Sequence, residues 1–211
     1  MRGLFITFEG IDGSGKSTQV KLLREFLDQQ GVRYQFAREP GGTLLGEQIR
    51  AILLDPVHRD MGVLTEALLY AASRAQLTRQ VLWPVLEEGR TVLCDRFVDS
   101  SLAYQGFGGG LDPTFLRELN SEATNGLKPD LTFLFDLPPQ AAAHRRRNSP
   151  ADRMERKESP FHERVREGYL VLARQEPERF KILDANGDIE QVQRIVRRLT
   201  VQALGLSSAQ A

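Results

Sequence analysis

A glycine-rich segment near the start of the chain combines residue types that could bind phosphate. It begins where the apolar run at residues 4–8 stops and ends where a helical pattern starts. Glycines let backbone N–H groups approach an anion closely, and the following helix adds the positive end of its dipole. A bare turn would need neither the lysine nor the hydroxyl that ends the segment, so we predict a P-loop that binds a nucleoside triphosphate. Its residues are Gly10, Ile11, Asp12, Gly13, Ser14, Gly15, Lys16, Ser17 and Thr18.

Two of these side chains have distinct expected roles, and a second acidic residue complements them. Lys16 would supply charge to the β- and γ-phosphates, and Ser17 is placed to coordinate Mg²⁺. Asp95 ends the apolar run at residues 91–94, where P-loop proteins often keep another acidic residue that holds Mg²⁺ directly or through water. Arg96 would then face phosphate, although an adjacent Asp-Arg pair also fits a structural ion pair at a strand end.

Further arginines and a tyrosine point to a second, smaller anionic substrate. Arg38 precedes the glycines at residues 41–42, which would allow close backbone approach, and Arg50 follows on the next predicted helix. Tyr70 and Arg74 are four residues apart and therefore share one helix face, offering a ring to stack on a base and a guanidinium to bond it. A core tyrosine beside a solvated arginine fits the spacing as well.

Two later segments carry polar and basic groups in unusual density. Residues 99–106 are rich in hydroxyl and amide groups, which suit recognition of a base or ribose and equally suit a polar loop that caps its own backbone. The basic stretch from residue 144 to about 158 could close over phosphates as a lid, excluding water and supplying an arginine to the transition state. A solvated charged face is the alternative. None of the three histidines has metal-ligand spacing, and we expect all three on the surface.

The elements that must position these residues alternate regularly along the chain. Apolar runs at residues 4–8, 34–37, 91–94, 131–137 and 180–183 predict five buried parallel strands. Helical patterns at 17–30, 45–54, 65–88, 112–123, 140–147, 160–176 and 188–204 lie between or after them. We therefore predict an α/β fold, a five-stranded parallel sheet with helices on both faces, and a site at the carboxyl ends of the strands. One domain over residues 1–206, with a short tail at 207–211, accounts for the whole sequence.

Composition limits the classes of partner and compartment. The 211 residues contain 28 Lys and Arg against 28 Asp and Glu, so no global positive charge favours nucleic acid. The single cysteine, Cys94, excludes an intramolecular disulfide and fits a small buried side chain in a reducing compartment. We find neither a signal-like segment nor an apolar stretch long enough to span a membrane. The expected location is cytoplasmic.

Four motifs in order closely resemble those of the bacterial thymidylate kinases, over essentially the whole chain. They are the P-loop, the run from Arg38 to Thr43, the helical residues from Tyr70 to Arg74, and Asp95-Arg96-Phe97 with residues 99–106. The resemblance implies the P-loop NTPase fold, a homodimer, and transfer of the γ-phosphoryl group of ATP to dTMP, giving dTDP and ADP for dTTP synthesis. It further implies Mg²⁺ and direct in-line transfer without a covalent enzyme intermediate.

The resemblance also implies residue roles. Asp12 would accept a hydrogen bond from the sugar 3′-hydroxyl, with Tyr104 crowding out ribonucleotides. Arg38, Arg50 and Arg96 would hold the dTMP phosphate, and Glu39 lies within the same substrate-binding motif. Tyr70 would stack on thymine, where the family commonly has phenylalanine. The residues expected to hydrogen-bond the thymine edge are Arg74, Ser101 and Gln105.

Members of the family differ in where they carry the catalytic arginine. Here the P-loop has none, whereas the lid holds several, so the chain is similar to the lid-arginine type. Arg153 is the first candidate, and Arg145 to Arg147 are the others. The expected catalytic set is therefore Lys16, Arg96 and Arg153.

Two other functions remain open on sequence grounds. A kinase for another nucleoside monophosphate or a deoxynucleoside would use the same P-loop. A nucleotide-dependent switch would also contain it, although the Asn-Lys-x-Asp segment by which GTPase switches read guanine is missing from the sequence.

Overall fold

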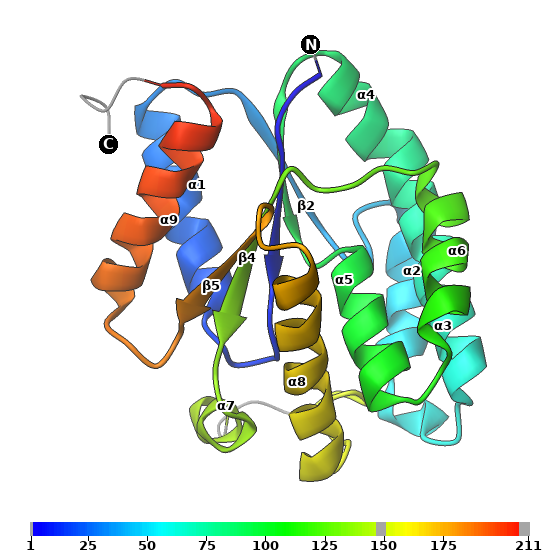
Figure 1. Ribbon diagram of the computed structural model, residues 1–211. Coiled ribbons are helices and arrows are strands. Elements are labelled where there is room, and N and C mark those ends of the chain that lie inside the picture. The colour runs from blue at the N-terminus through cyan, green and yellow to red at the C-terminus, as the bar shows by residue number, and fades with distance from the viewer. Residues whose placement is uncertain (1, 147–150, 207–211) are drawn as a thin grey trace.

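A parallel β-sheet forms the centre of the protein. The computed structural model describes residues 2–146 and 151–206, and within them five strands pair in the order β2-β3-β1-β4-β5, every neighbouring pair parallel (Figure 1). The strands are β1 (Phe5–Glu9), β2 (Tyr34–Arg38), β3 (Thr91–Asp95), β4 (Leu131–Asp136) and β5 (Phe180–Asp184). The predicted fold class is confirmed, and each predicted strand forms within a residue or so of its expected ends.

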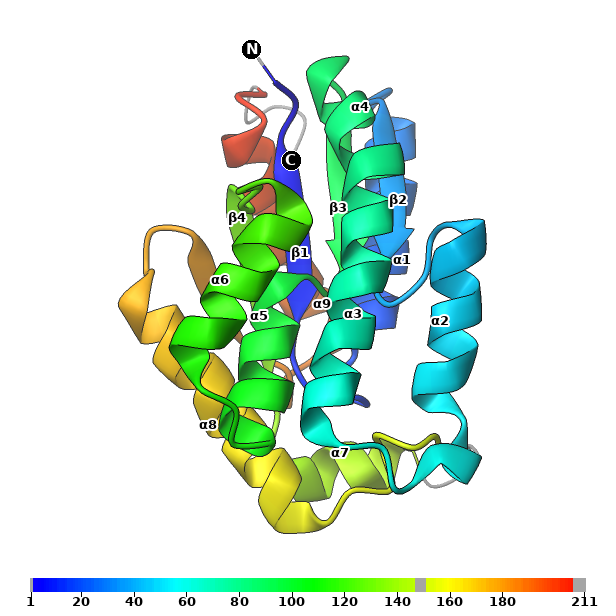
Figure 2. The ribbon, with the colours of Figure 1, turned by 90° about the vertical axis from the view of Figure 1, so that its right-hand side faces the viewer.

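Helices cover both faces of this sheet. On one face α1 (Lys16–Gln29) lies beside α9 (Ile189–Ala203), and the other face carries the remaining long helices (Figures 1 and 2). The short α7 (Pro139–Arg145) and residues 151–158 lie below the carboxyl ends of the strands. The helices of the second face, with α2 beside α3, are α2 (Leu44–Leu54), α3 (Val63–Leu77), α4 (Trp83–Glu87), α5 (Val98–Ser101), α6 (Pro113–Thr124) and α8 (Ser159–Gln175).

Strand β1 is buried on both faces, which explains its nearly continuous apolar sequence. Successive side chains of a strand point to opposite faces of a sheet. Phe5 accordingly belongs to a buried cluster with Leu82 and Leu86, whereas Ile6 belongs to the larger cluster that contains Leu23 of α1. Burial on both sides leaves Glu9, at the strand's carboxyl end, with no exposed surface.

The long helix predicted at residues 65–88 is interrupted. It consists of α3, a π-helical turn η2 (Thr78–Leu82) and α4. Pro84 has no backbone N–H to donate within a helix, and a π turn is a common way to change the hydrogen-bond register without ending the helix. A second π turn, η3 (Leu102–Gly108), follows α5, so most of the polar segment 99–106 is helical.

Local sequence signals set several helix ends. Asp112 caps α6 by accepting a hydrogen bond from the N–H of Thr114, with proline at the first helical position. Cys94 is buried in β3 as a free thiol, which confirms its expected role as a small core residue. The surface prediction was wrong for His162, which is 8% exposed because the start of α8 packs inward beside Phe161. The tail at 207–211 lies outside the described residues.

Candidate active site

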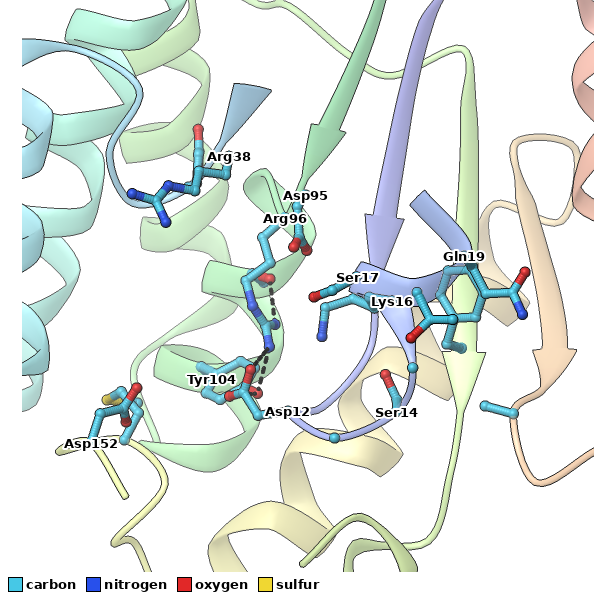
Figure 3. A pocket seen from close by; sticks show the side chains of 18 of the residues that line it. Asp12, Ser14, Lys16, Ser17, Gln19, Arg38, Asp95, Arg96, Tyr104 and Asp152 are labelled. Atoms are coloured by element: carbon cyan, nitrogen blue, oxygen red, sulfur yellow. Dashed lines mark hydrogen bonds and ion pairs between the residues drawn. The ribbon is translucent and has the colours of Figure 1, made fainter. Parts of the chain in front are cut away.

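One cavity lies at the carboxyl ends of the strands, where the sequence predicts the site. Its volume is about 670 Å³ (Figure 3). The P-loop forms one part of its wall, and residues of β2, α2, α3, β3, α5, η3 and α7 contribute to the rest. The predicted residues that line it, besides residues 12–18 of the P-loop, are Arg38, Glu39, Arg50, Tyr70, Asp95, Arg96, Ser101, Tyr104 and Gln105.

The P-loop connects β1 to α1 in the conformation that its glycines allow. Gly13 and Gly15 have φ values of 84° and 93°, in the left-handed region that favours glycine. Lys16 is 6% exposed, and its Nζ donates hydrogen bonds to the carbonyl oxygens of Gly10 (2.8 Å) and Ile11 (3.1 Å). Burial, together with the nearby charge of Arg96, lowers the pKa of Lys16 to about 8. The ammonium thus sits over the loop, where a phosphate oxygen can replace the carbonyls.

Ser17 and Asp95 both line the cavity, and their side-chain oxygens lie on the same side of the Lys16 ammonium (Figure 3). Oδ1 of Asp95 is buried and has no hydrogen-bond partner among the residues that the structure describes. An unpaired buried carboxylate oxygen near a hydroxyl fits Mg²⁺, which binds through one or two protein oxygens and otherwise keeps waters and substrate phosphates. Over the same described ranges, no cluster of three or more metal-ligating side chains occurs.

Arg96 lies at the centre of the cavity wall. Its backbone is left-handed, with φ of 69°, and its Nη2 donates to Asp12 Oδ1 (2.7 Å) and to the Tyr104 hydroxyl (3.3 Å) (Figure 3). Burial alone would raise the pKa of Asp12, but the charges of Arg96 and Lys16 outweigh it and hold that pKa below its usual range. Asp12 therefore stays ionised and keeps the guanidinium oriented toward the P-loop.

The buried side chain of Glu9 fixes the position of Arg96 from the side facing away from the cavity. Glu9 accepts hydrogen bonds from the backbone N–H of Phe97 (2.7 Å), the Ser100 hydroxyl (2.6 Å) and the Tyr169 hydroxyl (2.8 Å). Arg96 Nη1 donates to the same two hydroxyls, each at 3.2 Å. Burial, and then the charge of nearby Asp99, raises the pKa of Glu9 to about 7. Glu9 thus positions Arg96 through the two hydroxyls.

The arginines expected to hold the acceptor phosphate flank the end of β2. Arg38 donates from Nη2 to Oε2 of Glu47 (3.0 Å), and Arg50 donates from Nη1 to the carbonyl of Pro40 (2.9 Å). Both line the cavity with Arg96. The structure therefore brings the three predicted phosphate-binding arginines to one cavity.

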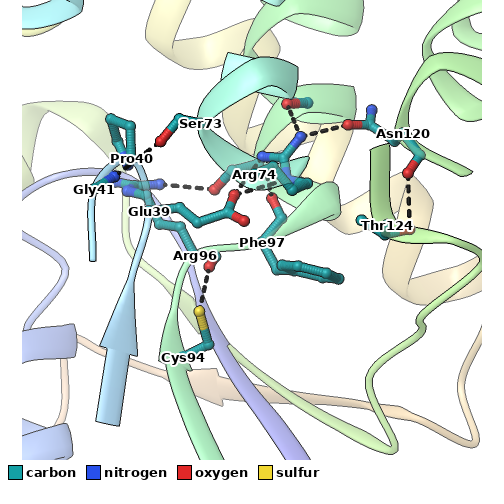
Figure 4. Close-up of polar contacts among 12 residues, drawn as sticks. Glu39, Pro40, Gly41, Ser73, Arg74, Cys94, Arg96, Phe97, Asn120 and Thr124 are labelled. Atoms are coloured by element: carbon teal, nitrogen blue, oxygen red, sulfur yellow. Dashed lines mark hydrogen bonds and ion pairs between the residues drawn. The ribbon is translucent and has the colours of Figure 1, made fainter. Parts of the chain in front are cut away.

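Arg74 does not line the cavity, unlike the other residues expected at the thymine edge. It is 1% exposed, and its Nε donates to Oε2 of Glu39 (2.7 Å) while its Nη1 donates to the Ser101 hydroxyl (2.9 Å) (Figure 4). It also donates to Oδ1 of Asn120 and the carbonyl of Phe97. In this structure Arg74 organises its neighbours and contacts the cavity only through them.

The lid segment lies below the cavity, and its described arginines differ in position. Arg145 lines the cavity and donates to the carbonyl of Ala185 (2.9 Å). Arg153 is buried and outside the cavity wall: its Nε donates to the carbonyl of Leu53 (2.7 Å), and its Nη1 is 2.6 Å from Oε2 of Glu66. Arg147 lies outside the described residues. The structure thus does not bring Arg153 to the P-loop, and its catalytic role stays a prediction.

Sequence reasoning missed the buried groups that hold the site together. Glu9 had a usable signal, because it is a charged residue between an apolar strand and the P-loop. Glu66 is one helical turn before Tyr70 and on the same face of α3, which is also a usable signal. Nothing in the sequence near Asn120 or Tyr169 points to the site, since only the folded chain brings α6 and α8 there.

Comparison with known proteins agrees with this geometry. The thymidylate kinase family model matches residues 8–196. The chain is 55% identical over 201 residues to a thymidylate kinase of Symbiobacterium thermophilum, covering 95% of this chain and 94% of the relative. It is 52% identical over 205 residues to one of an Exiguobacterium species, covering 97% of each.

A solved structure supports the same relationship. The crystal structure of thymidylate kinase from Ehrlichia chaffeensis superposes with a TM-score of 0.76 at 33% sequence identity, covering 95% of this chain and 99% of that one. No helix within residues 2–146 and 151–206 is long and apolar enough to cross a membrane. Sequence and structure together show that the chain belongs to the thymidylate kinase family.

Proposed function

We propose that this protein transfers the γ-phosphoryl group of ATP to dTMP, forming dTDP and ADP. One observation carries the proposal: a P-loop and three arginines of a second anion site line a single cavity, together with aromatic, hydroxyl and amide groups suited to a pyrimidine. A nucleotide switch would not need a second phosphate site beside the first. Membership in the thymidylate kinase family selects dTMP among the possible acceptors.

The P-loop end binds the triphosphate. Backbone N–H groups of residues 13–17 and the Lys16 ammonium would contact its phosphates, the lysine leaving the carbonyls that it contacts here. Ser17 and Asp95 would hold Mg²⁺, with the unpaired Oδ1 of Asp95 as the supporting observation. When bound, Mg²⁺ supplies positive charge that neutralises the β- and γ-phosphate oxygens.

Arg96 would lie between the two substrates and orient the acceptor. Together with Arg38 and Arg50 it would bind the dTMP phosphate, while Asp12 accepts a hydrogen bond from the 3′-hydroxyl beside Tyr104. No side chain needs to act as a general base, because a phosphate monoester is already largely ionised near pH 7. Positioning and charge neutralisation therefore account for the in-line transfer.

The lid would contribute a further arginine and exclude water. Arg145 already lines the cavity. Arg153 would first have to leave Glu66, and separating a buried ion pair costs roughly 3–5 kcal/mol when one charge stays behind unpaired. We therefore place Arg145 before Arg153 as the first lid arginine to test.

We also propose a homodimer in the cytoplasm. Large apolar side chains are exposed on the neighbouring helices α2 and α3, and apolar surface of this kind can mark a protein interface. The buried free thiol of Cys94 suits a reducing compartment. Sedimentation of the wild type and of Leu68→Glu tests the dimer, which we expect the substitution to weaken. The exposed residues are Leu44, Leu45, Ile52, Leu64 and Leu68.

An ADP-release assay tests the proposed reaction directly. ATP, Mg²⁺ and each nucleoside monophosphate in turn are supplied, beside a control without acceptor and a deoxynucleoside panel. We expect dTMP to be strongly preferred. Equal use of dGMP or of a deoxynucleoside would overturn the dTMP assignment, and release that ignores the acceptor would leave only the nucleotide-binding P-loop.

A further inference from the structure

Glu66 is a buried carboxylate that touches the cavity only through another side chain. It lies on α3 with 1% of its surface exposed and is not part of the cavity wall. Its Oε1 accepts a hydrogen bond of 2.8 Å from Nε2 of Gln105, which is 2% exposed and does line the cavity. Its Oε2 faces the guanidinium of Arg153.

This contact fixes which way the Gln105 amide points. A carboxylate paired with an arginine accepts hydrogen bonds and donates none, so the NH₂ group of the amide must face Glu66. Among the residues that the structure describes, no hydrogen bond reaches Oε1 of Gln105. The only free polar atom that Gln105 can offer a ligand is therefore an acceptor.

Ser101, on the same wall, adds a hydroxyl that can donate to a ligand. Its hydroxyl oxygen accepts a hydrogen bond of 2.9 Å from Nη1 of Arg74, a group that can only donate. Within residues 2–146 and 151–206 the hydroxyl hydrogen of Ser101 has no acceptor, so it can donate to a ligand in the cavity. Of these two groups, only Gln105 has its polarity fixed by a buried ionic side chain, because the Ser101 oxygen keeps a second lone pair.

We propose that Glu66 is a specificity-determining positioning residue, which holds Gln105 as an acceptor and thereby selects a pyrimidine with an N3–H and a 4-oxo group over one with a 4-amino group. Thymine and uracil present an N3–H donor beside the O4 acceptor, which matches an acceptor beside a donor. Cytosine presents an N3 acceptor, which clashes with the acceptor of Gln105, whereas the Ser101 hydroxyl can serve either O4 or the N4 amino group. The inference rests on the proposed function, because it needs the base to bind at Gln105 and Ser101.

Arg153 has a defined part in this arrangement. Its guanidinium contacts Glu66 Oε2 at 2.6 Å, and its backbone N–H and Nε donate to the carbonyls of Leu54 and Leu53 at the end of α2. The arginine thus holds the Glu66 carboxylate in place, with Oε1 turned toward the NH₂ group of Gln105. Arg153 acts on the base through Glu66 and Gln105.

Glu66→Gln tests the proposal, since an amide at this position can either accept or donate. With its NH₂ group toward Gln105, it would let the Gln105 amide turn over and offer a donor to cytosine N3. We expect the ratio of kcat/KM for dTMP to that for dCMP to fall about tenfold, the order expected for one hydrogen bond. dUMP is the matched control substrate, and the ratio of dTMP to dUMP should not change.

A double-mutant cycle separates this role from a general loosening of the site. In the Gln105→Ala background, adding Glu66→Gln should leave the ratio of dTMP to dCMP unchanged, because the amide it orients is gone. A full tenfold change in that background, or an unchanged ratio for Glu66→Gln alone, would overturn the proposal. A wild-type enzyme with no preference for dTMP would instead contradict the proposed function.

A second variant keeps the test decisive if Glu66→Gln does not fold. Glu66→Gln/Arg153→Gln removes both charges together, so no unpaired buried charge remains. It again puts an amide beside Gln105, and the ratio of dTMP to dCMP should fall as in the single variant. Thermal unfolding of each variant beside the wild type confirms that folded protein is being compared, and a wild-type ratio in the folded double variant would also overturn the proposal.

Discussion

Two walls of the cavity handle charge in opposite ways. The phosphate wall, formed by residues 12–18 with Asp95 and Arg96, presents its charged groups to the cavity. The base wall, formed by Tyr70, Ser101 and Gln105, presents neutral groups, and the charges that orient them stay buried behind it. A phosphate is bound by charge itself, whereas a neutral base is distinguished by the direction of hydrogen bonds, so each wall suits its ligand.

Removing a charge from the phosphate wall should have the largest effect. Lys16→Ala deletes the cation that would follow the transferred phosphoryl group, and we expect kcat to fall about 10³-fold with the fold intact. Steady-state ADP release and thermal unfolding measure the two quantities. Lys21→Ala is the matched control, because this lysine lies on the same helix with its side chain 78% exposed. A rate within tenfold of wild type for Lys16→Ala would mean that its phosphate role is misassigned.

The phosphate wall could be predicted from sequence because its parts are local. The P-loop lies within nine consecutive residues, and its position between a strand and a helix is itself visible in the apolar pattern. Asp95 and Arg96 follow a strand directly, and parallel strands bring their carboxyl ends together. Local motifs and a general rule of sheet topology were therefore sufficient to predict the phosphate wall, as they were to predict the sheet.

Breaking the ion pair behind the base wall should act mainly on stability. Arg153→Ala leaves Glu66 buried and uncompensated, and we expect the free energy of unfolding to fall by about 3 kcal/mol. Urea unfolding measures the loss. Arg156→Ala in the same segment is the control, because that side chain is exposed and its removal should change stability by less than about 0.5 kcal/mol.

A companion variant distinguishes this structural role from a catalytic one. In the Arg153→Ala background, adding Glu66→Gln removes the stranded charge and should restore part of the lost stability. Arg145→Ala, by contrast, should lower kcat with little change in stability. If Arg153→Ala unfolds like the wild type but its kcat falls sharply, Arg153 contacts the phosphates during catalysis. Its main role would then be at the phosphate wall and not behind the base wall.

The supports of the base wall could not be predicted in this way because their partners are distant in sequence. Glu66 meets Arg153, and Arg74 meets Ser101 and Asn120, only after α3, α6 and residues 151–158 have packed. Spacing placed Tyr70 and Arg74 on one helix face, and the structure confirms this, yet it sends the ring to the cavity and the guanidinium into the interior. Helical periodicity predicts which face of a helix carries a residue, but it does not predict whether the end of that side chain is buried or lines a cavity.

Behind the phosphate wall, Glu9 is a buried carboxyl group that acts on Arg96 through two neutral hydroxyls. Its pKa is raised from an ordinary 4.5 to about 7, chiefly by burial, so the folded protein binds a proton that the unfolded chain releases between these pH values. Stability should therefore decrease as pH rises from about 4.5 to 7, by at most about 3 kcal/mol in total from this group. Glu9→Gln removes this titration.

Urea unfolding at intervals from pH 4.5 to 7.5 measures the effect. We expect the slope of unfolding free energy against pH to be less negative in Glu9→Gln than in the wild type over this window. Glu190→Gln, at the exposed start of α9, provides the control and should keep the wild-type slope. Parallel curves for Glu9→Gln and the wild type would show that Glu9 remains ionised throughout, and its charge would then act on Arg96 directly.

The smallest effect is expected at the ring of the base wall. Burial, and then the charge of Glu66, holds the pKa of Tyr70 above its ordinary value, so the phenol stays neutral. Its hydroxyl makes no hydrogen bond to any residue in the described ranges, and the ring alone provides stacking. We expect Tyr70→Phe to change kcat/KM for dTMP by less than about threefold, whereas Tyr70→Leu should lower it by roughly 5- to 150-fold because base stacking is worth about 1–3 kcal/mol. Tyr34→Phe in β2 controls for the loss of the hydroxyl of a half-buried tyrosine elsewhere.

A loss above tenfold for Tyr70→Phe would mean that the Tyr70 hydroxyl itself binds the nucleotide. Base recognition would then depend on a third polar group, beside Ser101 and Gln105, that no buried charge orients.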